Sequence, residues 1–250
     1  MLKAVLFDLD DTLIDWSGAH EEWDMRERTL MRGVFDYVSS EIRPLDDFDN
    51  LVQIFRDRSR EAWEVGRSNL RAPHLGRVLL ETLTAAGIEQ QALDERRCLE
   101  AYNWGAVPGV VTFPDVPPVL ELLIERGIRI GIVTNAHQPM WIRDRELEQL
   151  GLLHYFPECR ISAADAGYLK PHPHIFKHAL KHIGVEASEA VFVGDNPVAD
   201  IAGAQGAGIH AVLRIRKSGS MLSGLITPDR SIHSFDELPP ILDEWYPGWR

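Results

Sequence analysis

The spacing of hydrophobic residues changes along the chain and divides it into segments of different structure. Ala4 to Phe7 is an apolar run of the length typical of a buried strand. From Leu13 to about Ala106, apolar residues recur at helical spacing and no strand pattern interrupts them. The spacing predicts four helices in this stretch, over residues 23–39, 51–65, 76–86 and 93–104.

After Pro108-Gly109, short apolar runs alternate with amphipathic segments. The runs predict strands at 128–133, 160–163, 190–193 and 210–215, and the segments predict helices at 116–126, 140–150, 173–183 and 198–205. Strands separated by helices of this length imply a doubly wound parallel sheet. The predicted fold is therefore α/β, with a Rossmann-like core of residues 1–14 and 107–250. An all-helical cap domain, residues 15–106, is inserted into this core.

Three carboxylates, Asp8, Asp10 and Asp11, follow the first strand. Carboxylates crowded together repel one another unless a cation or protons compensate, so the stretch suggests either a divalent metal site or an acidic turn in solvent. Alternate residues of an extended segment point the same way, which places Asp8 and Asp10 toward one site. Two such ligands suit Mg²⁺, and a carboxylate beside the metal can attack phosphorus as a nucleophile.

Polar residues also follow three later strands, whose carboxyl ends should lie at the same edge of the sheet. Thr134 and Asn135 offer a hydroxyl and an amide to phosphate oxygens. Lys170 precedes a predicted helix and would supply a compensating cation. Asp195 and Asp200 follow the strand at 190–193; a helix cap would explain Asp195 alone, but not this grouping of carboxylates at one edge.

The string Asp8-Leu9-Asp10-Asp11-Thr12 resembles the DxDxT signature of the haloacid dehalogenase-like hydrolase superfamily, most of whose members are Mg²⁺-dependent phosphatases. The segment from Gly167 to Phe176, which contains Lys170, resembles the third motif of that family. The resemblance covers nearly the whole chain and includes all four family motifs.

The resemblance implies a role for each of these residues. Asp8 would be the nucleophile that forms an aspartyl-phosphate. Asp10 would protonate the leaving alcohol and then activate the hydrolytic water. Thr134 and Asn135 would hold phosphate oxygens, and Lys170 would bridge the nucleophile and the phosphate.

The same resemblance implies a Mg²⁺ site. Asp8, the backbone carbonyl of Asp10 and Asp195 would hold the ion, and Asp200 would support it through water or Lys170. The expected function is hydrolysis of a small phosphorylated metabolite, with the cap domain covering the site and excluding water.

Three alternatives stay open. A 2-haloacid dehalogenase uses the same nucleophile against carbon, but these relatives lack the counterpart of Asp10 and the Mg²⁺ requirement. A phosphomutase differs only in returning the phosphoryl group to a sugar, and a non-catalytic binding module could share the scaffold. Family members that cleave carbon-phosphorus bonds use a cap lysine, whereas the segment from Arg26 to Arg97 has twelve arginines and no lysine.

Some of these arginines are candidates for substrate binding. The run Arg56-Asp57-Arg58-Ser59-Arg60 would supply a substrate clamp or, with its alternating charges, an ordinary charged helix face. The alternation favours the charged face.

Charge and composition bound the partners. The formal net charge is -12, from 38 acidic and 26 basic residues, so a nucleic acid is not an expected partner. No apolar run is long enough for a membrane span, and the chain starts with a strand rather than a signal peptide. Cys98 and Cys159 lack metal-type spacing and fit a reducing compartment, which predicts a cytoplasmic protein. The sequence leaves open whether it is a monomer or a homodimer.

Two further groups of residues receive structural interpretations. The seven tryptophans are expected in the core or in an oligomer interface rather than as platforms for a ligand. His174, His178 and His182 recur at helical spacing beside Lys177 and Lys181, which favours a solvated basic face over a metal cluster.

Overall fold

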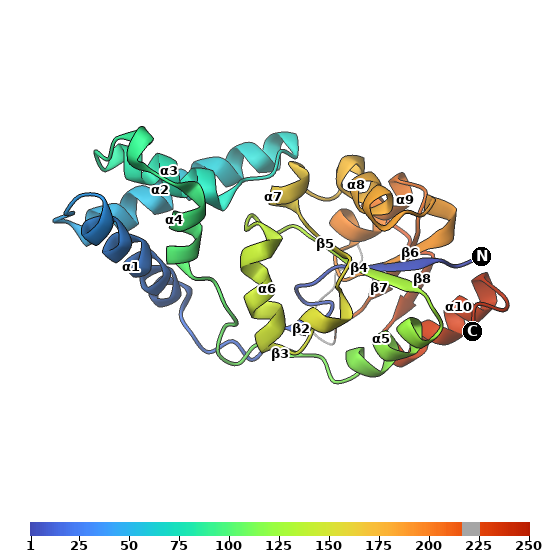
Figure 1. The fold of residues 1–250 in the computed structure, drawn as a ribbon. Helices are drawn as coiled ribbons and strands as arrows, with labels where there is room; N and C mark the ends of the chain where they lie inside the picture. The colour runs from blue at the N-terminus through green and yellow to red at the C-terminus, as the bar shows by residue number, and fades with distance from the viewer. Residues whose placement is uncertain (217–225) are drawn as a thin grey trace.

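A computed structural model of the protein describes residues 1–216 and 226–250. Within these residues six parallel strands form one sheet in the order β5-β4-β1-β6-β7-β8 (Figure 1). This arrangement confirms the predicted doubly wound α/β fold. The strands are β1 (Ala4–Phe7), β4 (Arg129–Thr134), β5 (Cys159–Ser162), β6 (Ala190–Gly194), β7 (His210–Arg214) and β8 (Arg230–Ile232). The sequence pattern gave no sign of β8, which is three residues long and has one buried side chain.

The first strand lies in the middle of the sheet, where β1 pairs with β4 on one side and β6 on the other. All four of its residues are fully buried. Their side chains alternate, so that Ala4 and Leu6 join one hydrophobic cluster while Val5 and Phe7 join the other. The strands β4 and β5 are added on one side of β1, and β6, β7 and β8 on the other. In parallel sheets, ligands bind beyond the carboxyl ends of the strands at the point where the strand order changes side.

Helices cover both faces of the sheet (Figure 1). On one face lie α8 (Pro173–Ile183) and α9 (Gly203–Gly206), and on the other lie α5 (Val116–Glu125) and α10 (Leu238–Trp245). The helix α6 (Met140–Gln149) lies between the sheet and the helices of the early chain, and the short helix α7 (Ala163–Ala166) follows β5.

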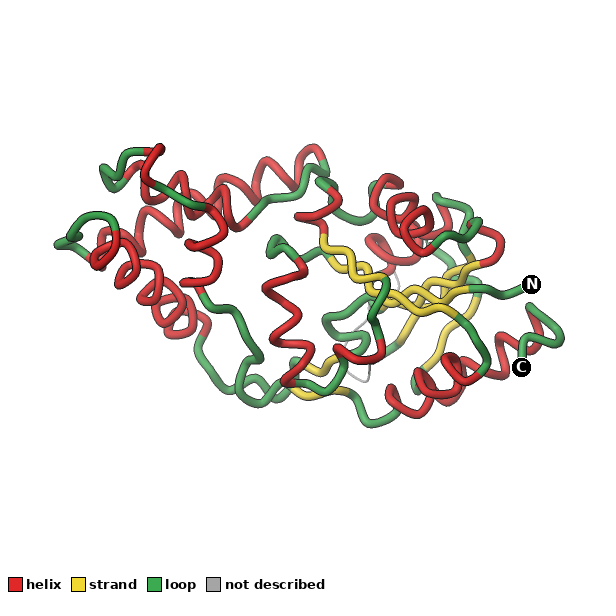
Figure 2. The backbone as a smooth tube through the Cα atoms, in the orientation of Figure 1, coloured by secondary structure: helices red, strands yellow, loops and turns green. Residues whose placement is uncertain are grey.

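The early chain folds into four helices with a core of their own, which we call the helical insert. They are α1 (Trp23–Glu41), α2 (Phe48–Asn69), α3 (Leu75–Ala85) and α4 (Glu95–Tyr102). Figure 2 shows these helices as a group apart from the strands. Asp47 and Asp94 begin α2 and α4 by accepting hydrogen bonds from the backbone N–H groups of Asn50 and Arg97.

The two crossings between the sheet and the helical insert lie side by side. The short strands β2 (Ile14–Asp15) and β3 (Val111–Thr112) pair antiparallel within them. The backbones also touch further out, because a Cβ added to Gly18 would lie 2.4 Å from the carbonyl oxygen of Gly109. Strands of two residues are too short to show a period in the sequence. The domain bounds at residues 15 and 106 stay a prediction.

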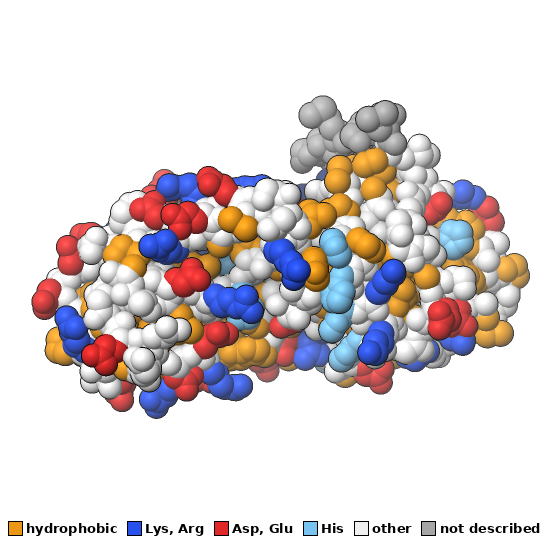
Figure 3. Space-filling model, turned by 90° about the horizontal axis from the view of Figure 1, so that it is seen from above, with side chains coloured by type: hydrophobic (Ala, Val, Ile, Leu, Met, Phe, Trp, Pro, Cys, Tyr) orange, Lys and Arg blue, Asp and Glu red, His pale blue; other side chains and the backbone are white. Residues whose placement is uncertain are grey.

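The surface carries no single dominant charge on the face shown in Figure 3, where acidic and basic side chains are interspersed over the helical insert. A row of histidines is visible beside it, in agreement with the ring contact of His174 with His178 at 6.2 Å. His182 instead meets the carbonyl oxygen of Glu158 at 2.8 Å. In the described part of the chain, these histidines form no group of three able to hold one ion. Both cysteines are free and buried, and no described helix has the length and apolar character to cross a membrane.

The packing at β4 generates a test of the fold. A Cβ on Gly131 would lie 2.8 Å from the Cys159 sulfur and 2.9 Å from Leu6 Cδ2. We expect Gly131→Ala to lower the free energy of unfolding by ~1–3 kcal/mol because the side chain overpacks the core. Gly206→Ala is the matched control, since no atom lies within 4 Å of that position, and it should leave the free energy unchanged or raise it slightly. Urea unfolding measures both, and equal losses would contradict this account of the core.

Candidate active site

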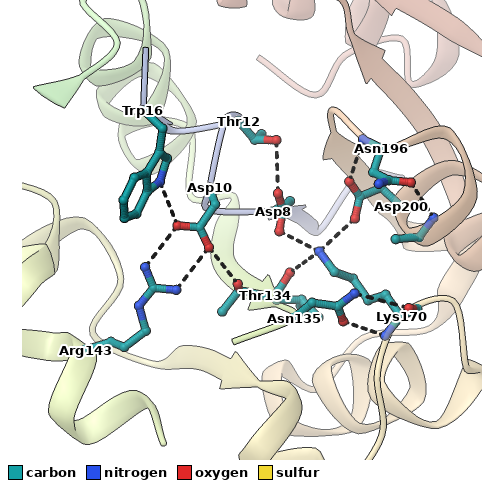
Figure 4. Close-up of polar contacts among 12 residues, drawn as sticks. Asp8, Asp10, Thr12, Trp16, Thr134, Asn135, Arg143, Lys170, Asn196 and Asp200 are labelled. Atoms are coloured by element: carbon teal, nitrogen blue, oxygen red, sulfur yellow. Dashed lines mark hydrogen bonds and ion pairs between the residues drawn. The ribbon is translucent and has the colours of Figure 1, made fainter. Parts of the chain in front are cut away.

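The predicted site residues come together at the carboxyl edge of the sheet, and Figure 4 shows all of them except Asp195. They line one cavity of about 620 Å³ between this edge and the helical insert. The expectation that the carboxyl ends of parallel strands lie at one edge therefore brought together residues that are far apart in the chain. The residues that it brought to the cavity are Asp8, Asp10, Thr134, Asn135, Lys170, Asp195 and Asp200.

Lys170 is the central cation of the site. Its Nζ lies 2.5 Å from Asp8 Oδ1 and 2.7 Å from Asp200 Oδ1, and it donates a hydrogen bond of 2.8 Å to the carbonyl oxygen of Val133. Only 4% of the residue is exposed. Burial alone would lower the pKa of Lys170, but the charges of Asp200 and Asp8 outweigh burial and raise it. The ammonium is therefore charged at neutral pH.

Asp8 is buried at the end of β1 and accepts a hydrogen bond of 3.3 Å from the Thr12 hydroxyl. Burial raises the pKa of Asp8 to about 8, with a further contribution from the negative charge of Asp200, although Lys170 opposes both effects. One ammonium thus falls short of compensating the negative charge around the nucleophile candidate.

The carboxylates fit a divalent cation. Asp8, Asp195 and Asp200 each present an oxygen, and these oxygens lie within 4.8 Å of one another. Burial and the charges of Asp200 and Asp11 raise the pKa of Asp195 to about 7. Three hard oxygen donors beside one ammonium leave uncompensated negative charge, which a Mg²⁺ ion would neutralise.

The segment after β6 explains how Asp200 reaches this group. A Cβ on Gly194 would lie 2.4 Å from the Asp200 carboxyl group, so only glycine leaves room for it. The Asn196 side chain accepts hydrogen bonds from the backbone N–H groups of Val198 and Ala199 and begins the next helical turn. The N–H of Asn196 donates to Asp200 Oδ2 at 2.9 Å.

Asp10 lies apart from the three carboxylates and faces an arginine that sequence reasoning missed. Arg143 of α6 binds it through two hydrogen bonds, of 3.1 and 3.0 Å (Figure 4). Trp16 Nε1 and the Thr134 hydroxyl donate to the same carboxylate at 3.0 and 3.3 Å. Burial raises the pKa of Asp10, but the charge and hydrogen bonds of Arg143 outweigh it and the net pKa is lowered. Asp10 is therefore held as an ionised acceptor.

Arg143 also connects the site to the second crossing. Its Nε donates to Glu146 Oε2 at 2.7 Å, and Trp104 Nε1 donates to the same oxygen at 3.0 Å. Arg143 and Glu146 are 3% and 0% exposed. The sequence shows only an arginine and a glutamate three positions apart on a helix, a common surface pair, so it carried no signal for this role.

The side chain of Asn135 contacts the backbone of Lys170, and His172 lies at the start of α8. Asn135 accepts a hydrogen bond of 2.7 Å from the backbone N–H of Lys170 and donates one of 3.2 Å to its carbonyl oxygen. Its amide thus holds the segment that carries Lys170, and contact with phosphate stays a prediction. His172 caps α8, stacks on Tyr168 at 4.0 Å and is not among the residues that line the cavity.

The prediction that tryptophans lie in hydrophobic cores is confirmed for Trp104 and Trp249, which are buried in two different cores. Trp249 is buried in the core and Trp245 packs against it, as expected. Four of the seven tryptophans, Trp104 among them, also line the cavity, which the sequence did not predict. They are Trp16, Trp23, Trp63 and Trp104.

Comparisons with known proteins agree with this geometry. A family model described as haloacid dehalogenase-like hydrolase matches residues 2–208. The chain is 33% identical to the glyceraldehyde 3-phosphate phosphatase of Methanopyrus kandleri over 87% of this chain and 85% of the relative. It is 30% identical to the phosphoserine phosphatase of Thermus thermophilus, over 84% and 88% of the two chains.

A solved structure of a 2-haloacid dehalogenase from Pseudomonas syringae superimposes with a TM-score of 0.66 at 32% identity, covering 98% of this chain and 100% of that one. The family model spans most of the chain, and the relatives match along most of their own length. The protein therefore belongs to the haloacid dehalogenase-like hydrolase family, as the motifs of its sequence predicted.

Proposed function

We propose that the protein is a Mg²⁺-dependent phosphatase that hydrolyses a small phosphate ester through an aspartyl-phosphate. The observation that carries this proposal is the contact of Asp8 with the buried ammonium of Lys170, beside Asp195 and Asp200. The two relatives named phosphatases support the same chemistry.

In the first step, an Asp8 oxygen attacks phosphorus and the ester oxygen leaves as the alcohol. Lys170 lowers the pKa of Asp8 and offers positive charge to the transferring phosphoryl group, and a bound Mg²⁺ would supply the remaining positive charge that keeps the carboxylate ionised. Thr134 and Asn135 are placed at the cavity wall to orient phosphate oxygens. Mg²⁺ held by Asp8, Asp195, Asp200 and the Asp10 carbonyl would neutralise charge on the phosphate.

In the second step, water attacks the phosphorus of the aspartyl-phosphate and releases inorganic phosphate and free Asp8. Asp10 is prepared to accept the proton of this water, because its four hydrogen bonds hold it ionised. To protonate the leaving alcohol in the first step, Asp10 must carry a proton and turn away from Arg143. We therefore propose that Arg143 stabilises the ionised form of Asp10, which acts as the base in the second step.

Two rival functions share the nucleophile. One rival function is 2-haloacid dehalogenation, because a structural neighbour is named a 2-haloacid dehalogenase. The carboxylate group of Asp8, Asp195 and Asp200 favours the phosphatase, because attack on a haloacid carbon involves no phosphoryl charge for a metal ion to neutralise. Phosphomutase chemistry differs only in the acceptor of the phosphoryl group.

The free, buried cysteines agree with the proposed cytoplasmic location.

Asp8→Asn removes the proposed nucleophile with little change of shape. We expect kcat for an aryl phosphate to fall at least ~10³-fold, because the amide cannot form the phosphoryl-enzyme. Asp36→Asn, on the exposed side of α1, is the matched control and should keep wild-type activity. Phosphate release measures both variants. Substantial activity in Asp8→Asn would refute the mechanism, and turnover of 2-chloropropionate without phosphatase activity would establish the dehalogenase.

Removal of divalent cations tests the carboxylate group. EDTA should abolish phosphate release, and added Mg²⁺ should restore it. Asp195→Asn should raise the Mg²⁺ concentration for half-maximal activity at least ~10-fold, because the site loses one charged oxygen donor. Calorimetric titration with Mg²⁺ provides a readout independent of activity. Full activity in EDTA would rule out the metal.

Arg143→Lys tests the contact with Asp10. Lysine keeps the charge but loses the two-point geometry, so we expect kcat to fall ~10–100-fold with a smaller change in KM. Arg145→Lys, an exposed arginine on the same helix, is the control. Steady-state kinetics on one substrate compare the two variants, and equal kcat values would show that Arg143 has no part in positioning Asp10.

A further inference from the structure

The side of the cavity formed by the helical insert and the crossings is almost entirely apolar. Nine residues of this side line the cavity, and two of them, Glu27 and Ser59, are polar without an aromatic ring. The other seven form what we call the aromatic wall: Trp16, Trp23, Leu30, Phe55, Trp63, Tyr102 and Trp104.

The rings of the aromatic wall contact one another. Trp23 lies edge-on to Trp16 at 6.5 Å and to Trp104 at 6.2 Å between ring centroids. Phe55 and Tyr102 form a second pair at 6.0 Å. These contacts fix neighbouring rings into broad apolar surfaces rather than isolated side chains.

The aromatic wall has no positive charge within it. Glu27 is the charged residue on this side of the cavity, and the Nε of Arg56 lies 2.5 Å from its carboxylate. Arg56 itself is outside the lining, as are the other two arginines of the run 56–60, which pair with Glu61 and Asp57. The run therefore forms the charged helix face favoured by its sequence, and only Ser59 of it reaches the cavity.

The two cations on the opposite side are both engaged. Lys170 contacts the carboxylates of Asp8 and Asp200, and Arg143 contacts those of Asp10 and Glu146. Among the described residues that line the cavity, no other lysine or arginine is present. His137 also lines the cavity, but burial and the charge of Arg143 lower its pKa to about 4, so its ring is neutral. Beyond the phosphate itself, a second negative group on a substrate would thus find no ion-pair partner there.

This distribution of charge selects among phosphate esters. A carboxylate or second phosphate placed against the aromatic wall would lose its hydration without gaining a partner, which is unfavourable. An apolar or aromatic group would leave water and pack on the rings, which is favourable.

We infer that the alcohol portion of the substrate is uncharged and apolar or aromatic, and that the aromatic wall binds it. This inference rests on the proposed phosphatase function and specifies its substrate class. It separates the protein from enzymes whose phosphate esters carry a second anionic group.

A cationic group is the other ligand that aromatic rings bind, but two guanidinium groups already lie near the Trp104 ring. The guanidinium of Arg26 lies 5.3 Å from the Trp104 ring centroid, and that of Arg143 lies 5.9 Å from it. Arg56 compensates Glu27, the carboxylate that lines the cavity beside the aromatic wall. Both guanidinium groups are bound to carboxylates, Arg26 to Glu21 and Arg143 to Asp10 and Glu146, so a substrate carboxylate gains no free partner from them. A substrate ammonium at the aromatic wall finds Glu27 already paired, so the neutral group is favoured there.

Three benzyl phosphates with different para substituents test the inference on the wild-type protein with Mg²⁺. The substituents are tert-butyl, trimethylammonium and carboxylate; the first two have the same shape, and the methylene group separates the reacting oxygen from ring electronics. We expect kcat/KM for the tert-butyl ester to exceed that of each charged ester at least ~10-fold.

An added cation should reverse part of this preference. Ser59→Arg places a guanidinium at the cavity and should raise kcat/KM for the carboxylate ester relative to the tert-butyl ester at least ~10-fold. Val65→Arg, at an exposed position of the same helix, adds the same charge away from the cavity and should leave the ratio unchanged. Circular dichroism confirms that both variants fold.

The outcomes separate the inference from the proposed function. If the carboxylate or trimethylammonium ester is hydrolysed as well as the tert-butyl ester or better, the substrate class is wrong while the phosphatase stands. If glyceraldehyde 3-phosphate is hydrolysed and none of the benzyl esters is, the substrate class is again wrong. If no phosphate ester is hydrolysed, the proposed function itself fails.

Discussion

A buried ammonium between two carboxylates is the interaction on which the site depends. Lys170 and Asp8 are 162 positions apart in the chain, yet their charged atoms lie 2.5 Å apart at almost complete burial. Neither charge would be tolerated alone at this depth, since removal from water without a partner is strongly unfavourable. The sheet must therefore bring the end of β1 and the start of α8 together, and the Asn135 amide holds the Lys170 backbone in place. Even so, the carboxylates outnumber the ammonium, which leaves negative charge that a divalent ion would neutralise.

Much of this arrangement follows from the sequence. Apolar runs that end in polar residues predicted β1, β4, β5, β6 and β7, and the rule that parallel strands share one carboxyl edge then brought Asp8, Thr134 and Asp195 together. The rule works because it depends on the position of a residue at a strand end and not on its neighbours. The helices of the insert were predictable from apolar spacing, because this spacing is local to each helix; the boundaries agree within a few residues.

The contacts that sequence reasoning missed depend on how elements pack. Arg143 meets Asp10 only because α6 lies against the end of β1, and no spacing within residues 140–149 reports that distance. Aromatic residues at helical spacing resemble core residues; whether Trp63 or Trp104 faces a core or a cavity depends on the docking of the helical insert. The strand β8 and the pair of β2 with β3 are too short to produce a period.

The two sides of the cavity divide the recognition of a substrate into separate physical problems. At the sheet edge, binding depends on ion pairs. The cost of burying these charges is offset by the contacts of Lys170 and Arg143 with their carboxylates. At the aromatic wall, the absence of free charge among the described lining residues makes desolvation itself selective. Trp16 belongs to both sides, since its ring lines the wall while its Nε1 donates to Asp10 at 3.0 Å. A group that packs against this ring therefore also touches the residue that orients the proposed acid-base, so binding of the alcohol portion and positioning of Asp10 are physically connected.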